Sequence, residues 1–462
     1  MAKKSKTQKN EDSITSEYSQ EEDHSGNESI EENKKVKKDD FDEDETRIIL
    51  AKRTLEKARN EIKSKHGQLN QNDNNSNNND SEKEDDINEL NSFFQQNDLV
   101  KARKNKVLLF DKILKGLSKH SKEENTQFLF GHKRPITMCV FNPVTSDLVT
   151  VGKEGAILIF RKKLNYKRFV INPGYPKSET GHAGEILAID ISSDGKYIAT
   201  GGKDRELKVW NLSKIDDLFN LTPINKPVNH LVYLNPETSL KGHKGAITCI
   251  RFRYNSYECV TGSDDMTLKI WDVDQKGGMD TFYGHRATMT DITQISDRNF
   301  ISSSCDKFPI LWKLEKESQM IFQEQLFPID SICALNQFIF VTGSQTGEVA
   351  IWNIAKKKFI TKTDEFTNQG WVSSITTVYN SDFFIVGGLE DFVQIYTYES
   401  TKMGEINITR GPKIKTEGVI SSMALTPDGK HLAIVESEEN RLGRWTPRTN
   451  IKGKIRLVSL FN

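Results

Sequence analysis

The sequence is poor in apolar residues, which fill only 35% of its 462 positions, below the ~45–50% of an average globular domain. This deficit indicates a folded region accompanied by a polar one. Net charge is lacking too, because 65 Lys and Arg residues balance 65 Asp and Glu residues. A strong overall attraction to nucleic acid is therefore excluded, and any contact with RNA must use local basic patches.

Clustered metal ligands and membrane segments are also missing. No cysteine belongs to a CxxC pair, and all five lie in apolar, strand-like runs. This pattern favours buried free thiols in a reducing compartment over a zinc site. The five are Cys139, Cys249, Cys259, Cys305 and Cys333. Because no apolar run is long enough to cross a bilayer or to form a signal-peptide core, we expect a soluble intracellular protein without membrane contact.

The N-terminal part is expected to be polar and partly helical. Residues 1–42 have almost no apolar content, so they cannot offset the entropy lost on ordering, and we expect disorder. Their two basic clusters, Lys3–Lys6 and Lys34–Lys38, suit nuclear import, or are simply a solvated run of charge.

Two helices are expected before the folded region, over 43–65 and 90–120, with an asparagine-rich linker at 66–89 between them. Each helix has an apolar stripe that it cannot bury alone. Docking of these helices on a partner is favoured over packing against the edge of the neighbouring domain.

A repeating pattern fills residues 126–462, where short β-rich runs alternate with Gly, Asp and Asn turns. Gly-His pairs occur at 131–132, 181–182, 242–243 and 284–285, each followed after 27 or 28 residues by an aromatic residue that ends a strand. The strand-ending aromatics are Phe160, Trp210, Trp271, Trp312, Trp352, Tyr396 and Trp445. Seven units of this length predict an all-β, seven-bladed propeller, with an exposed insertion near 213–239.

Three of these units share further polar residues at fixed spacing. An aspartate lies six residues before the tryptophan and a hydroxyl residue lies ten before it. This pattern resembles the WD-repeat family, in which His, Ser or Thr, Asp and Trp form a hydrogen-bonded tetrad. The implied tetrads are His182, Thr200, Asp204 and Trp210; His243, Thr261, Asp265 and Trp271; and His285, Ser302, Asp306 and Trp312.

These tetrads also look like Ser/His/Asp triads, but we interpret them as structural. A set that recurs in three blades, with its hydroxyl inside a strand, is typical of a folding device and not of an active site. Neither a phosphate-binding GxxxxGK[ST] motif nor an HExxH metal motif is present. We therefore expect a protein that is not an enzyme and uses no cofactor.

A narrower resemblance is to the WD-repeat subunits of the U3 small nucleolar ribonucleoprotein. It is carried by DETRIILAKRTLEKARNEI (44–62), GHAGEILAIDISSDGKYIATGG (181–202) and NRLGRW (440–445), the last preceded by two glutamates. The resemblance implies a nucleolar, non-catalytic RNA-binding scaffold that acts in processing of 18S pre-ribosomal RNA. The implied partners are U3 RNA at a kink-turn element, a kink-turn-binding protein, other box C/D core proteins and small-subunit processome proteins, with no small-molecule substrate.

Blade seven is unusual in the sequence. Arg444 precedes its aromatic, whereas the other six units have Ile, Val or Leu at this position. An arginine inside a packed strand must be paired, here with Glu436 or Glu438, or must face a ligand. Arg441, two residues earlier, is expected near the start of the strand and exposed.

Basic residues are expected to gather on the face that carries the Gly-His loops. The candidates for RNA contact are Lys133, Arg134, Lys153, Lys203, Arg205, Lys244, Arg286 and Lys307, with Arg441 and Arg444. Two questions stay open at this level: which face contacts RNA, and whether 126–130 or 454–460 is the outer strand that closes the ring. The alternative functions are a ubiquitin-ligase substrate receptor, disfavoured because Trp271-Asp272 lacks the following x-Arg, and a chromatin scaffold.

Overall fold

The computed structural model describes the repeat region and a short segment before it. The described residues are 107–119, 126–171, 181–214, 230–232, 235–363, 370–400, 406–443 and 451–461. They all belong to one of two compact units, Asp85–Asn462. The expected tail (1–42), first helix (43–65) and linker (66–89) lie outside the described residues.

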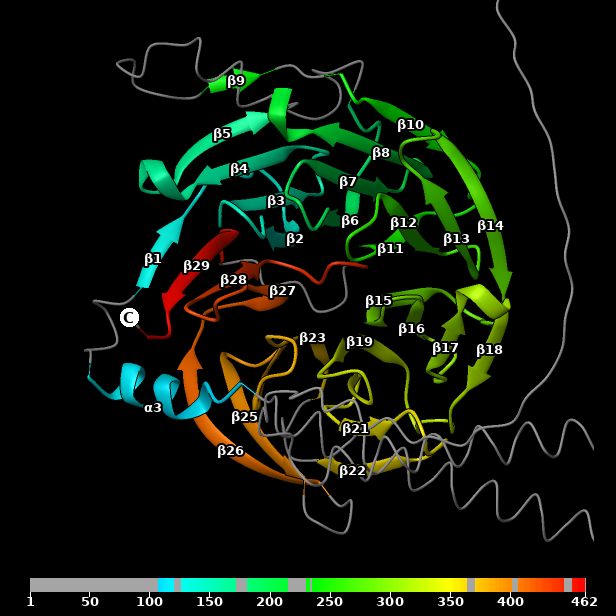
Figure 1. Ribbon diagram of the computed structural model, residues 1–462. Coiled ribbons are helices and arrows are strands. Elements are labelled where there is room, and N and C mark those ends of the chain that lie inside the picture. The colour runs from blue at the N-terminus through cyan, green and yellow to red at the C-terminus, as the bar shows by residue number, and fades with distance from the viewer. Residues whose placement is uncertain are drawn as a thin grey trace, which may run out of the picture. The chain divides into compact units, whose positions relative to one another are not determined.

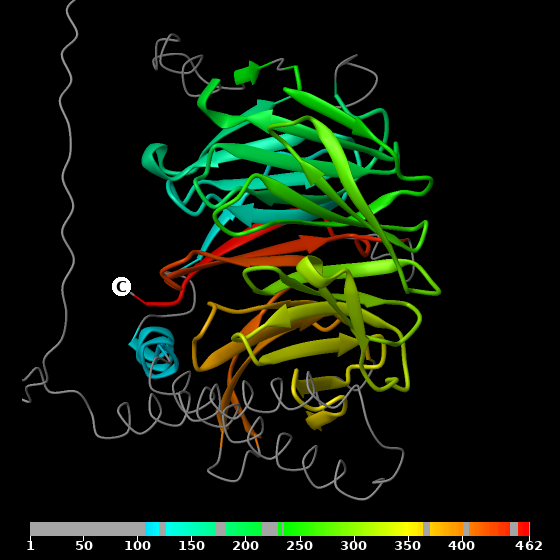
Figure 2. The same cartoon turned by 45° about the vertical axis from the view of Figure 1, so that its right-hand side comes forward.

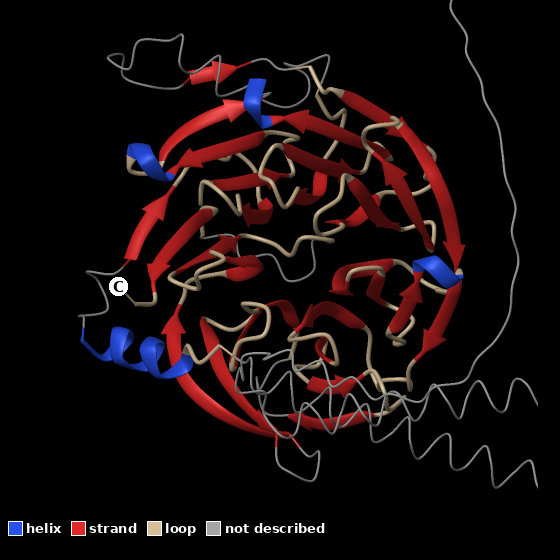
Figure 3. Ribbon diagram, in the orientation of Figure 1, coloured by secondary structure: helices blue, strands red, loops and turns tan. Residues whose placement is uncertain are grey.

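Seven antiparallel blades surround a central channel, which confirms the expected β-propeller (Figure 1). Strands account for nearly all of the regular structure of the described chain (Figure 3). The innermost strands of neighbouring blades contact one another around the ring. β-Branched and aromatic residues dominate these strands, as a pleated sheet packed on both faces requires.

The strands of each blade are given from the channel outward. Blade one contains β2 (Ile136–Phe141), β3 (Leu148–Gly152), β4 (Ile157–Arg161) and β5 (Lys167–Ile171). Blade two contains β6 (Ile186–Ile191), β7 (Tyr197–Gly202), β8 (Glu206–Asn211) and β10 (Thr238–Lys241). Blade three contains β11 (Ile247–Phe252), β12 (Glu258–Ser263), β13 (Thr267–Asp272) and β14 (Gly277–Tyr283).

The next three blades follow the same order. Blade four contains β15 (Met289–Ser296), β16 (Asn299–Ser304), β17 (Ile310–Lys313) and β18 (Ser318–Ile321). Blade five contains β19 (Ile329–Ala334), β20 (Ile339–Ser344), β21 (Val349–Asn353) and β22 (Phe359–Thr363). Blade six contains β23 (Val372–Thr376), β24 (Phe383–Gly388), β25 (Phe392–Ser400) and β26 (Ile406–Lys415).

Blade seven joins the two ends of the propeller and closes the ring. Its strands are β27 (Val419–Leu425), β28 (His431–Ser437), β29 (Lys454–Ser459) and β1 (Thr126–Leu129). The segment before blade one therefore supplies the outer strand, and the C-terminal segment supplies the third strand. Because β1 pairs with β29, the two segments hold each other in place through backbone hydrogen bonds.

Two short 3-10 helices, Lys162–Leu164 and Leu314–Lys316, lie between the third and fourth strands of blades one and four. The insertion after blade two's third strand also contributes regular structure, since its β9 (His230–Val232) pairs in parallel with β5. The expected exposed loop is thus partly a strand added to the outside of blade one. Its residues 215–229 lie outside the described residues.

The helix expected over 90–120 does not run unbroken through its described part. Val107 forms a parallel bridge with Ser381, and α3 spans only Phe110–Lys119. Asp382 causes the change, because its carboxylate accepts hydrogen bonds from the backbone N–H of Leu109 at 2.9 Å and of Phe110 at 3.1 Å. A carboxylate in this position satisfies free donors at the start of the helix and favours its positive end.

Helix α3 packs against blades six and seven, near the C-terminal end of the chain (Figure 2). Ile113 is fully buried in a cluster with Val393 of blade six and Val458 and Leu460 of blade seven. Packing against the edge of the propeller, the disfavoured alternative, is therefore what the described part of this segment does through Ile113, whereas Leu108 and Leu114 of the predicted stripe are exposed. Among the described residues, no helix is long and apolar enough to span a membrane.

The five cysteines are free thiols; Cys139, Cys249 and Cys259 are buried, and Cys305 and Cys333 are half-buried. Burial raises the pKa of Cys139, Cys249 and Cys333 to about 12, so these thiols stay protonated at neutral pH.

Candidate functional site

Hydrogen-bonded side chains link the second and third strands of blades two to four to the Gly-His loops. In blade two, His182 Nδ1 lies 2.7 Å from Asp204 Oδ2, and its Nε2 lies 2.8 Å from Thr200 Oγ1. The indole N–H of Trp210 donates to the same hydroxyl at 2.8 Å. Because the carboxylate only accepts, the ring proton sits on Nδ1, and the hydroxyl donates to Nε2.

The same bonds recur in blades three and four. The relevant distances fall between 2.7 and 3.0 Å in the sets His243, Thr261, Asp265, Trp271 and His285, Ser302, Asp306, Trp312. The imidazoles are buried. Burial lowers the pKa of His243, although Asp265 opposes this effect. The lowered pKa keeps the His243 ring neutral.

Blade one contains a fourth set that the sequence analysis missed. His132 Nδ1 lies 2.6 Å from Glu154 Oε1, and its Nε2 lies 2.9 Å from Thr150 Oγ1. Glu154 and Thr150 stand six and ten residues before Phe160, the same spacing as in the other blades. The signal was present, but a glutamate replaces the expected aspartate and a phenylalanine replaces the tryptophan.

These carboxylates also fix the Gly-His loops through backbone hydrogen bonds. Glu154 accepts from the N–H groups of Lys133 at 2.7 Å and Arg134 at 2.6 Å. Asp265 accepts from Lys244 at 2.8 Å, and Asp306 accepts from Arg286 at 2.9 Å. In blades one, three and four the buried network therefore sets the position of the basic residue in the neighbouring Gly-His loop.

The ionised form of these carboxylates is favoured in the folded protein. Burial alone would raise the pKa of Asp265, but hydrogen bonds from Thr267, from the Lys244 N–H and from His243 outweigh it and lower the pKa. The pKa values of Glu154, Asp204 and Asp306 are lowered for similar reasons, again against the effect of burial.

Most of the basic candidates lie exposed on the face that carries these loops. The exposed ones are Lys133, Arg134, Lys203, Arg205, Lys244 and Arg286, and Lys307 is half-buried. Two of the seven have acidic partners: Lys203 lies 2.9 Å from Glu185, and Lys307 lies 3.9 Å from Glu324. Arg205 and Lys307 also occupy left-handed backbone conformations, with φ values of 67° and 74°, directly after the tetrad aspartates.

Two candidates are not on the surface, which corrects the expectation from sequence. Lys153 is buried, and its Nζ donates to Glu439 Oε1 at 2.9 Å and to the Asn440 carbonyl oxygen at 3.1 Å. Arg441, expected to be exposed, is only 7% exposed. Arg444 lies outside the described residues.

The cause of the error at Arg441 is the third strand of blade seven. It was assigned to the run ending at Trp445, but the strand is β29 (Lys454–Ser459). Val458 pairs with Leu432 there, just as Trp210 pairs with Ile198 in blade two, so a valine takes the place of the aromatic. NRLGRW instead belongs to a long connection over 438–453, between the second and third strands.

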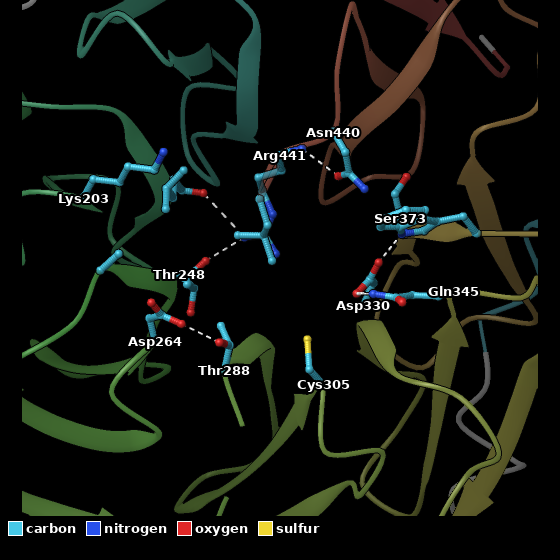
Figure 4. A pocket seen from close by; sticks show the side chains of 14 residues that line it. Lys203, Thr248, Asp264, Thr288, Cys305, Asp330, Gln345, Ser373, Asn440 and Arg441 are labelled. Atoms are coloured by element: carbon cyan, nitrogen blue, oxygen red, sulfur yellow. Dashed lines mark hydrogen bonds between the residues drawn. The ribbon is translucent and has the colours of Figure 1, made fainter. Parts of the chain in front are cut away.

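This connection sends Arg441 into the central channel. Its guanidinium donates to the carbonyl oxygens of Thr248 at 2.7 Å and Thr290 at 2.5 Å, and reaches that of Leu187 at 3.5 Å. These carbonyls belong to β11, β15 and β6, the innermost strands of three successive blades. One side chain from blade seven thus ties together blades two, three and four. Figure 4 shows its contact with Thr248.

Arg441 forms part of the wall of a cavity of about 220 Å³ at the mouth of the channel. Asp264, Cys305 and Asp330 stand around the same space (Figure 4). Asp330 is buried, and its carboxylate accepts hydrogen bonds from Gln345 Nε2 at 3.1 Å and from the Trp371 indole N–H. Burial raises its pKa to about 6, although the hydrogen bonds and Arg441 oppose the rise.

Comparison with known proteins agrees with this fold. The family model for the WD domain, G-beta repeat, matches residues 175–211 and 234–272, which include most of blades two and three. Two solved structures cover 73% of the chain with TM-scores of 0.64: the RRP9 WD40 repeats, at 22% identity over 98% of that chain, and U3-55K, at 23% over 99%. The chain is a seven-bladed β-propeller in which blades two and three carry the WD-type repeat.

Relatives found by sequence similarity have names that are more specific than the fold. The chain is 25% identical to "U3 snoRNP-associated protein-like EMB2271" of Arabidopsis thaliana, over 68% of this chain and 66% of that protein. It is 24% identical to "Ribosomal RNA-processing protein 9" of Saccharomyces cerevisiae, over 60% and 58%. It is 23% identical to "U3 small nucleolar RNA-interacting protein 2" of Homo sapiens, over 72% and 68%. The aligned part thus spans less than two thirds of the first two relatives. The predicted resemblance to U3 ribonucleoprotein WD-repeat subunits is confirmed.

Proposed function

We propose that this chain is a non-catalytic RNA-binding scaffold of the U3 small nucleolar ribonucleoprotein, acting in the nucleolus in processing of small-subunit pre-ribosomal RNA. The observation that carries the proposal is its similarity to WD-repeat proteins from a plant, a yeast and a mammal that are named for U3 RNA or for ribosomal RNA processing. The partners are U3 RNA, a kink-turn-binding protein and other proteins of the box C/D core and the small-subunit processome.

The loop face gives this proposal a physical basis. The exposed basic side chains of blades one to four stand on loops whose backbones are fixed by buried carboxylates. Cations on loops of fixed backbone suit phosphate contact, because the loops need not become ordered on binding. The set is small and partly paired with acids, so bare RNA should bind weakly and with strong salt dependence.

Specificity therefore comes from a composite surface, part RNA and part kink-turn-binding protein. Such cooperation lets a few phosphate contacts act within a larger interface. Arg444 and the blade-seven connection near it belong to the same proposal, because NRLGRW is among the strings that carry the resemblance.

The first test is capture of the tagged protein from cells, followed by sequencing of the bound RNA. Enrichment of U3 RNA is the expected result, and recovery of a different RNA class or of none would refute the proposal. Titration of purified protein onto U3 RNA, with and without the kink-turn-binding protein, then tests cooperation. Equal affinity in the two titrations would exclude the composite surface.

The RNA-contacting face is tested by charge reversal with a matched control. Lys133, Arg134, Arg286 and Lys307 are changed together to glutamate. The control reverses Lys276, Lys356, Lys357 and Lys358, four cations in loops between third and fourth strands, which open on the opposite face. Both variants change the net charge equally. We expect only the first to weaken the ternary complex and flatten its salt dependence, by a slope of up to roughly 0.7–0.9 per lost phosphate contact.

A further inference from the structure

The cavity at the channel mouth differs in charge from the loops around it. Its lining includes Asp264 and Asp330, and its two cations are already engaged: Lys203 with Glu185, and Arg441 with three backbone carbonyls. The lining thus holds two carboxylates and two cations that already have partners, and the exposed basic residues of the loops form the rim around it.

Asp330 lacks the partner that a buried carboxylate normally has. Its two hydrogen-bond partners, Gln345 and Trp371, are neutral donors, and no Lys or Arg of the described residues forms an ion pair with it, although the charge of Arg441 acts on it from a greater distance. A buried carboxylate without a counter-ion is unfavourable, because solvation lost on burial is not replaced. A positively charged group that entered the cavity would supply the missing interaction.

Trp371 stands beside Asp330 in a strained backbone conformation. Its φ is 79°, a left-handed value that bulky residues rarely adopt, and Gly370 before it has a φ of 74°. The hydrogen bond from its indole N–H to Asp330 holds the ring at the cavity wall. Such strain gathers at ligand sites, and an indole face attracts cations.

We propose that this cavity binds one arginine or lysine side chain of a protein partner, between Asp264, Asp330 and Trp371. The volume of about 220 Å³ is too small for a drug-sized ligand but suits a single side chain. A guanidinium fits best, since its planar set of donors can pair with the Asp330 carboxylate through two parallel hydrogen bonds. Phosphate is disfavoured, because it would approach a desolvated carboxylate of the same charge.

The test is ¹⁹F NMR of the full chain labelled with fluorotryptophan, with a Trp371→Phe variant to identify the Trp371 signal. The probes are the blocked peptides Gly-Gly-Arg-Gly-Gly, its lysine counterpart and its citrulline counterpart, which keeps the shape of arginine without its charge. We expect the arginine and lysine peptides to shift the Trp371 signal at millimolar concentration. Citrulline should bind roughly tenfold more weakly.

The variants Asp330→Asn and Asp264→Asn separate binding from folding. Each should weaken binding of the arginine peptide by roughly tenfold. Because Asp264 is exposed, the Asp264→Asn variant should fold even if Asp330→Asn does not. Asp280→Asn on the outer strand of blade three is the matched control and should change affinity less than twofold. The proposal is overturned if citrulline and arginine bind equally, if no charged peptide shifts the signal, or if a U3 oligonucleotide shifts it and the peptides do not.

Discussion

The guanidinium of Arg441 donates to the carbonyl oxygen of Thr248 at 2.7 Å, so a residue of blade seven lies against the innermost strand of blade three. Innermost strands leave backbone carbonyls facing the channel, where they need donors. Lys153 of blade one holds the same connection through Glu439. Four blades are thereby linked to the blade that closes the ring.

Replacement of Arg441 by alanine should destabilise the fold by about 2–4 kcal/mol, because it removes charged hydrogen bonds to buried carbonyls. Chemical unfolding measures this loss. Arg286→Ala, on the exposed rim, should change stability by less than about 0.5 kcal/mol and instead weaken RNA binding. A stable Arg441→Ala protein with impaired RNA binding would show that Arg441 acts as a ligand contact.

Replacement of Asp265 by alanine should destabilise the protein by about 1–3 kcal/mol, since His243 Nδ1 and the Lys244 N–H lose their acceptor. Glu154→Ala in blade one should have an effect of the same size, because Glu154 makes equivalent bonds. Asp274→Ala, at an exposed turn, is the control. The measurement is the melting temperature of each variant. If Glu154→Ala melts at the same temperature as the control, the hydrogen bonds of blade one do not stabilise the fold.

The effect of Asp265 should depend on pH in a defined direction. Its folded pKa lies below its unfolded value near 3.8, so its stabilisation is present above that pH and is lost as the pH falls further. Asp265→Asn should therefore be clearly less stable than the parent protein at pH 7. The difference should shrink below about pH 4. A difference that stays constant from pH 7 to pH 3 would contradict this mechanism.

Asp330 should show the opposite sign. Its folded pKa of about 6 exceeds the ordinary 3.8, so the unfolded chain releases this proton first and stability decreases as the pH rises from 4 to 6. The pKa of about 6 already includes the lowering effects of Gln345, Trp371 and Arg441. Relative to the parent, Asp330→Asn should gain on the order of 2–3 kcal/mol between pH 4 and pH 7. The prediction would be refuted if the unfolding midpoints of the two proteins changed in parallel between pH 4 and pH 7.

The blades could be predicted from the sequence because each is a run of short hairpins. Hairpins of constant length place Thr200, Asp204 and Trp210 at fixed spacing, so a pattern in the chain becomes a pattern in space. The blade-one set has the same spacing, but Glu154 stands in place of the expected aspartate and Phe160 in place of the tryptophan. Glutamate can replace aspartate since its extra methylene still reaches both His132 and the loop N–H groups.

The rule failed in blade seven, where the connection over 438–453 replaces a tight turn. Spacing counted through it assigned Trp445 to a strand that is in fact formed by Lys454–Ser459. Nothing local marks Arg441 as buried, because its partners Leu187, Thr248 and Thr290 are 254, 193 and 151 residues away in the chain.

The sequence by itself determined the number of blades, the aromatic residue in the third strand of the first six and the polar networks within three of them, because these depend on neighbours in the chain. Tertiary structure alone decided that β1 closes the ring outside β29, that Arg441 enters the channel, and that Asp264 and Asp330 meet across a cavity. Those arrangements depend on contacts between blades. Such contacts exist only after the ring has closed and brought residues from distant repeats to one axis.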